Sequence, residues 1–189
     1  MVLPEADREN IEALLAIIQS DIELAIQKLN LAPENERPFY SRSYLRAYAS
    51  WVEGMLHMHK SLIANNNQSW HAELPIECQL YLFEADWYIA ASGKPKLTDK
   101  KIRTRQNIKA FFTVSSELFS DYEVDFGTHG WECVLSFYKL RDSLMHPEQA
   151  SVLTLSVEEI GECDSGRKWL LEQFQLVRDQ IKIKSRESA

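Results

Sequence analysis

Apolar side chains recur every three or four residues along most of this sequence, and that period constrains the fold more than any other feature. Glycine and proline number only six each, and most of them fall between the periodic stretches. The first stretch shows the pattern in seven residues: Ile11, Leu14, Leu15, Ile18, Ile22, Ile26 and Leu29. The sequence therefore predicts an all-α fold of long helices rather than a sheet with many turns.

Capping and breaking residues divide the chain into six expected helices. Pro75 suits a first helical turn, Thr98 can cap the next helix, and Pro147 ends another. The expected helices span residues 7–31, 41–65, 75–91, 98–119, 128–145 and 156–183. Because the connections are short and 189 residues can bury one core, we expect a single domain over residues 1–189, built as a helical bundle.

The last expected helix leaves two interpretations open. Ser156 and Glu159 fit a capping box, in which a serine precedes a glutamate by three residues. Gly161 and Gly166 weaken a helix that continues beyond this start. We expect one long C-terminal helix, and two shorter helices are the alternative.

Charge and cysteine content restrict the location and the partners. The formal net charge is -7, which argues against strong binding of nucleic acid over the whole chain. Cys78, Cys133 and Cys163 are odd in number and contain no CxxC pair, which is typical of free thiols in a reducing compartment such as the cytoplasm. No stretch is apolar enough for a membrane span, and no metal or cofactor motif is recognisable.

One motif near the end of the fifth expected helix combines groups suited to phosphate chemistry: Arg141-Asp142-Ser143-Leu144-Met145-His146, followed by Pro147. Five steps along an ideal helix do not bring Arg141 and His146 to one face. Pro147 disfavours helical dihedral angles at His146, so the imidazole can turn back toward Arg141. A guanidinium can bind phosphate oxygens, and a histidine can exchange a proton near neutral pH.

A structural interpretation accounts for the same residues. Cations in a last helical turn offset the helix dipole and can bond its free carbonyl groups. Arg141 and His146 could serve only that purpose.

The motif resembles the signature of HEPN domains, in which an arginine and a polar residue precede a histidine by a fixed spacing. The resemblance covers the chain from about Tyr40 to the last helix, and only the Arg–His motif in it is fairly specific. It implies a dimeric helical bundle that cleaves RNA without a metal, by attack of the ribose 2′-hydroxyl on the adjacent phosphate. His146 would act as acid or base, Arg141 would hold the phosphate, and Asp142 would orient the pair.

The resemblance also implies partners. Many family members act as toxins or in phage defence, often beside an antitoxin or a nucleotidyltransferase-like subunit. In the subgroup that such a partner inactivates, a tyrosine stands two residues after the histidine. Glu148 occupies that position here, which puts this form of control in doubt.

A basic stretch is the second feature that bears on RNA. Between residues 94 and 109, seven cations surround a single acid, Asp99. Lys101, Arg105 and Lys109 are spaced to share one helical face, and we expect them to contact RNA. A solvated helix face is the alternative interpretation.

Two hypotheses of different kinds follow. The first is a HEPN-like endoribonuclease that acts as a homodimer. The second is a non-catalytic helical module that binds a protein or RNA, as a regulatory or immunity subunit. Burial of Arg141 against a carboxylate would favour the module.

Overall fold

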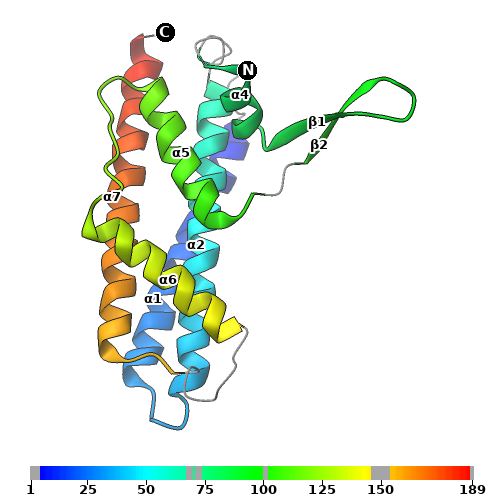
Figure 1. Cartoon of the computed structure of the whole chain (residues 1–189). Coiled ribbons are helices and arrows are strands. Elements are labelled where there is room, and N and C mark those ends of the chain that lie inside the picture. The colour runs from blue at the N-terminus through cyan, green and yellow to red at the C-terminus, as the bar shows by residue number, and fades with distance from the viewer. Residues whose placement is uncertain (1–4, 67–69, 71–73, 100–101, 146–153, 188–189) are drawn as a thin grey trace. The chain divides into compact units, whose positions relative to one another are not determined.

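A computed structural model describes residues 5–66, 70, 74–99, 102–145 and 154–187. The described residues are mostly helical, which confirms the all-α bundle (Figure 1). They form six helices and one two-stranded sheet: α1 (Glu5–Leu31), α2 (Arg37–Asn66), α4 (Ile76–Leu82), β1 (Ala85–Ile89), β2 (Pro95–Asp99), α5 (Thr104–Leu118), α6 (His129–Met145) and α7 (Val157–Glu187). Within these ranges, no helix has both the length and the apolar character that crossing a membrane requires.

The chain divides into two compact units. Unit 1 comprises Met1–Asp7, Leu56–Val124 and Gln175–Ala189, and unit 2 comprises Arg8–Met55 and Asp125–Phe174. Helices α2 and α7 are each divided between the two units, with one part in unit 1 and the other in unit 2. The expectation of one domain over residues 1–189 stays a prediction.

The core of unit 2 is aromatic. Tyr48 of α2 lies 3.8 Å from Phe137 of α6, measured between ring centroids, and Trp51 meets Phe174 of α7 edge to face. All four side chains are buried. Since aromatic side chains bury large areas, these contacts supply much of the cohesion between α2, α6 and α7 in this unit.

The core of unit 1 combines α5 with the second part of α2 and the end of α7. Phe111 and Phe112 of α5 are fully buried, and Phe111 meets the ring of His59 from α2 edge to face. Trp70 packs against Phe119 in the same way. The alternation of buried and exposed residues along α5 is the helical period that the sequence predicts.

The third and fourth expected helices are wrong in part. The helix expected over 75–91 ends at Leu82, and Thr98, the expected cap of the fourth helix, lies in β2 instead. Strands β1 and β2 pair as an antiparallel hairpin, and α5 begins only at Thr104. The run Trp87-Tyr88-Ile89 is apolar at every position, so it fits the helical and the strand period equally well. Its aromatic and β-branched residues favour a strand.

The C-terminal region is one helix, as expected. Ser156 Oγ accepts a hydrogen bond from the Glu159 amide at 3.1 Å, and the Ser156 amide donates to Glu159 Oε2 at 2.8 Å. This reciprocal pair is the capping box that the sequence predicts. The helix continues through Gly161 and Gly166 to Glu187.

Candidate functional site

Close packing fixes α6, the helix that carries the Arg–His motif, against α7 in unit 2. A Cβ atom on Gly166 of α7 would lie 2.9 Å from the backbone nitrogen of Val134, and one on Gly130 of α6 would lie 2.4 Å from the Trp169 ring. Only glycine allows these two approaches, because any side chain would displace backbone or a large ring. The position of α6 is therefore set well before its last turn.

Arg141 and Asp142 lie together in the last turns of α6. Arg141 Nη1 donates a hydrogen bond to Asp142 Oδ1 at 3.2 Å, and the two side chains are 36% and 52% exposed. Leu144 of the same turn is buried, so this part of α6 has one buried apolar side and one solvent-exposed side. Arg141 is thus paired at the surface rather than buried against a carboxylate.

The guanidinium of Arg141 has further donors to offer. A guanidinium carries five N–H groups, and among the described residues Arg141 uses one of them, toward Asp142. The remaining donors are oriented in a planar fork that matches phosphate oxygens.

His146, the other half of the motif, lies outside the described residues. Helix α6 is described as far as Met145, the residue immediately before it, and the expected end of the helix before Pro147 lies outside the described residues. The structure therefore brings Arg141 and Asp142 together, and the approach of His146 to Arg141 stays a prediction.

The expected RNA-binding residues belong to unit 1. Arg105 and Lys109 are exposed on α5 and stand four residues apart, which is the spacing of one helical face. Lys101 lies outside the described residues. Their contact with RNA stays a prediction.

The three cysteines are free thiols with little nucleophilic character. Burial raises the pKa of Cys163 to about 12, and burial with a hydrogen bond to Glu117 raises that of Cys78 to about 11. The pKa of buried Cys133 is also raised, chiefly by burial. Because the thiolate is the reactive form, these residues do not suit covalent catalysis near neutral pH.

The histidines of α2 lie on different sides of the helix. His57 is exposed and His59 is 1% exposed, so the two do not form a ligand pair. Across the part of the chain that the structure describes, no three His, Cys, Asp or Glu side chains gather where they could hold a metal ion.

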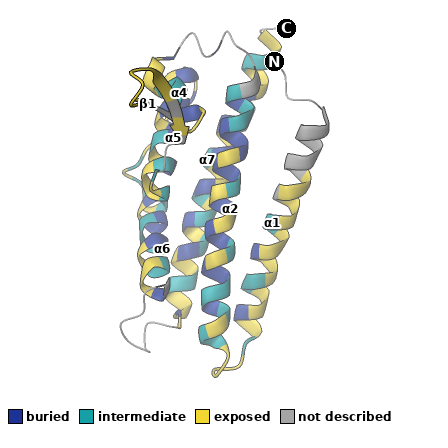
Figure 2. Ribbon diagram, turned by 90° about the vertical axis from the view of Figure 1, so that its right-hand side faces the viewer, coloured by how far each residue is buried: buried dark blue, intermediate teal, exposed yellow. Residues whose placement is uncertain are grey.

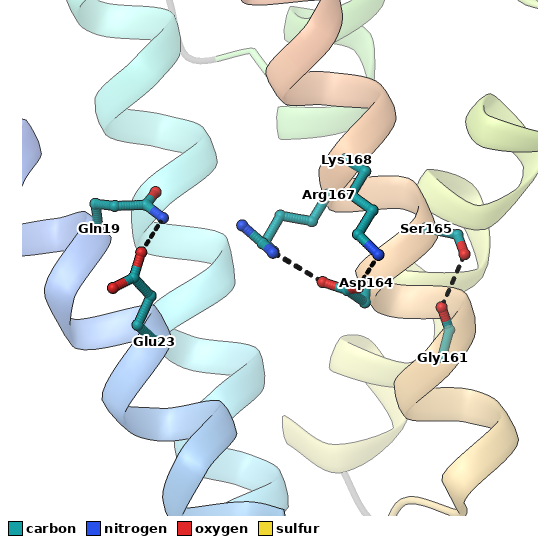
Figure 3. Close-up of polar contacts among 7 residues, drawn as sticks. All are labelled: Gln19, Glu23, Gly161, Asp164, Ser165, Arg167 and Lys168. Carbon is teal, nitrogen blue, oxygen red and sulfur yellow. Dashed lines mark hydrogen bonds and ion pairs between the residues drawn. The ribbon is translucent and has the colours of Figure 1, made fainter.

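An ion cluster on α7 is a feature that the sequence analysis missed. Asp164 pairs with Arg167 and with Lys168, each at 2.8 Å (Figure 3). Burial alone would raise the pKa of Asp164, but the hydrogen bonds from Lys168 and Arg167 outweigh it and hold the pKa below its ordinary value. The spacing of three and four residues was the available signal.

A buried lysine in unit 1 was also missed. Lys60 of α2 is 2% exposed, lies 3.0 Å from Glu84 Oε1, and sits 4.1 Å above the centroid of the Tyr81 ring. Burial lowers the pKa of Lys60, and the hydrogen bond with Glu84 opposes that shift. These partners lie more than twenty residues from Lys60 in sequence, so no local pattern indicates them.

Comparison with protein-family models, with curated proteins and with solved structures finds no match to this chain.

Proposed function

We propose that this chain is a HEPN-like endoribonuclease that uses Arg141 and His146 to cleave RNA. The observation that carries the proposal is the state of Arg141. Its guanidinium is partly exposed at the end of α6 and hydrogen-bonded to a surface carboxylate, with donors left for a phosphate. Burial of Arg141 against a carboxylate would instead have favoured a non-catalytic module.

The reaction needs one proton carrier and one phosphate ligand. His146 removes the proton from a ribose 2′-hydroxyl, whose oxygen attacks the adjacent phosphorus as the bond to the 5′-oxygen breaks. The products are a 2′,3′-cyclic phosphate and a 5′-hydroxyl end, whose oxygen takes up the proton that His146 has removed from the 2′-hydroxyl. Arg141 binds the non-bridging oxygens and stabilises the charge that develops on them.

Asp142 acts as a positioning residue in this proposal. Its carboxylate accepts a hydrogen bond from Arg141 Nη1 and so restricts the orientation of the guanidinium. A homodimer would bring two such motifs to one substrate, and a protein partner such as an antitoxin would restrain the activity.

An RNA cleavage assay in the presence of EDTA tests the proposal. We expect the wild type to cleave and to leave cyclic phosphate ends, while Arg141→Ala and His146→Ala lose at least about a hundredfold in rate. Arg46→Ala is the matched control, since Arg46 is an exposed arginine on α2 in the same unit. Equal cleavage by His146→Ala and wild type would overturn the role of His146.

A non-catalytic interaction module is the second candidate. Four large apolar side chains of α1 are more than half exposed: Leu14, Ile17, Leu24 and Leu31. Exposed apolar surface of this kind is typical of helices that bind another protein. Absence of cleavage by the folded wild type would favour this candidate over the ribonuclease.

A further inference from the structure

The β1–β2 hairpin of unit 1 places an aromatic side chain directly across from a lysine. In its register, Tyr88 of β1 pairs with Lys96 of β2, and Ile89 pairs with Pro95. Side chains opposite each other in an antiparallel pair lie on the same face, within about 5 Å at Cβ. Both Tyr88 and Lys96 are exposed.

A tight loop closes the hairpin. The Gly93 amide donates to the Ala90 carbonyl at 2.8 Å, and the Ala90 amide donates to the Lys94 carbonyl at 3.0 Å. Gly93 has a φ of 75°, which a residue without a side chain adopts at little cost. Lys94 is therefore held beside the end of the ladder, one residue beyond the glycine.

The root of the hairpin is anchored on α2 of the same unit. Glu84, the residue before β1, has a φ of 52° and pairs with the buried Lys60. The strands then extend away from α4 and α5, and their described side chains are exposed (Figures 1 and 2). An isolated two-stranded ribbon gains little stability in water, so the root contact helps to maintain it.

Positive charge is concentrated from Lys94, at the β2 side of the hairpin, to the start of α5, while β1 carries one acid, Asp86. Lys94 and Lys96 are exposed on the hairpin, and Arg103 and Arg105 are exposed where α5 begins. Asp99 is the single acid between residues 94 and 109, in a chain whose net charge is -7. Cations gathered against the overall charge are complementary to a polyanion.

We propose that the hairpin binds single-stranded RNA, with Tyr88 stacked on a base and Lys94 and Lys96 bound to the flanking phosphates. Arg103 and Arg105 continue the path of phosphate contacts onto α5. An exposed ring among exposed cations is the combination that binds single strands, because every base has a face to stack and every linkage has a charge. The choice of RNA rests on the proposed ribonuclease function.

Fluorescence anisotropy of a labelled oligouridine of about twelve nucleotides tests this inference. The parental protein is the full chain with Arg141→Ala, so that cleavage does not interfere. We expect Tyr88→Ala to weaken binding about tenfold and Tyr88→Trp to retain it, because tryptophan also stacks. Lys96→Ala should lower the slope of log affinity against log salt by about 0.7.

Matched controls lie in unit 2. Phe39→Ala removes an exposed aromatic side chain from α2, and Lys28→Ala removes an exposed cation from α1. Both should bind as the parental protein does. Circular dichroism confirms that each variant retains its helices.

Three outcomes would overturn the inference. They are no binding by the parental protein, equal binding by Tyr88→Ala and Tyr88→Trp, and equal weakening by Lys28→Ala and Lys96→Ala. The second outcome would point to charge alone, as an acidic protein partner would use it. Because binding is measured without cleavage, an inactive wild type would contradict the proposed function and leave this inference standing.

Discussion

The two units differ in how the hydroxyl groups of particular buried tyrosines are paired. In unit 1 the hydroxyl of Tyr81 donates to Asn107, with its carbonyl at 2.7 Å and its side-chain Oδ1 at 2.8 Å, and Lys60 is paired with Glu84. In unit 2 the hydroxyls of Tyr44 and Tyr48 are fully buried and have no hydrogen-bond partner among the described residues.

The difference indicates what each unit depends on. In unit 1, polar pairs connect α4 and the hairpin to α2 and α5, so the stability of this unit depends on the geometry of those pairs. In unit 2, Tyr44 and Tyr48 contribute mainly by their size, beside the close glycine contacts of α6 and α7. A buried polar group without a partner costs about 1–3 kcal/mol, whereas an apolar replacement of the same shape can be neutral or stabilising.

The largest effect should come from the glycine contact in unit 2. Gly166→Ala would place a Cβ atom 2.9 Å from the backbone of Val134, so α6 and α7 would have to separate. We expect the free energy of unfolding to fall by about 2–3 kcal/mol in urea titrations. Gly161→Ala in the same helix meets nothing within 4 Å and should raise it by about 0.5–1 kcal/mol. Equal effects of the two changes would contradict close packing as the basis of unit 2.

The buried ion pair of unit 1 should give the next largest effect. Glu84→Gln removes the anion and leaves Lys60 in its buried position, so we expect a loss of about 2 kcal/mol. The half-exposed position of Glu84 keeps this below the cost of a fully buried pair.

Lys60→Met is the matched control for the ion pair. It retains an apolar stem against the Tyr81 ring and leaves Glu84 in contact with water, so stability should change by less than about 1 kcal/mol. A loss as large as that of Glu84→Gln would mean that the charge itself, rather than its pairing, stabilises unit 1.

The smallest effects should come from the tyrosine hydroxyls, and they should differ in sign between the units. Tyr81→Phe breaks the hydrogen bonds to Asn107 and should cost about 1 kcal/mol. Tyr48→Phe removes a hydroxyl that is buried without a described partner, and it should be neutral or stabilising by up to about 1 kcal/mol. Urea titrations at neutral pH measure both. Destabilisation by Tyr48→Phe would show that its hydroxyl is satisfied in solution, for example by water, and would remove the contrast.

The long helices could be predicted because their signals are local. Ser156 with Glu159 starts α7, and the hydrogen bonds of this capping box join residues only three positions apart. The hairpin could not be predicted in the same way, because an apolar run such as Trp87-Tyr88-Ile89 suits either period. Gly93 was the available signal, since a glycine in a short loop after such a run is typical of hairpins.

The candidate site could likewise be predicted only where its signals are local in the sequence. The sequence indicates that Arg141 lies near a helix end, and the structure adds its exposure and its bond to Asp142. The pairing of Lys60 with Glu84, and of Tyr81 with Asn107, depends on which helices meet in space. Such contacts follow from tertiary packing, and no spacing in the sequence specifies them.

The sharing of α2 and α7 between the units has a consequence for synthesis of the chain. Unit 1 is assembled from three separate segments and unit 2 from two, and the last segment of each includes a part of α7. On the ribosome, neither unit can close its core until α7 has left the exit tunnel. The apolar faces of the earlier helices therefore stay uncovered until then, and we expect the unfinished chain to aggregate more readily than one whose domains are contiguous in sequence.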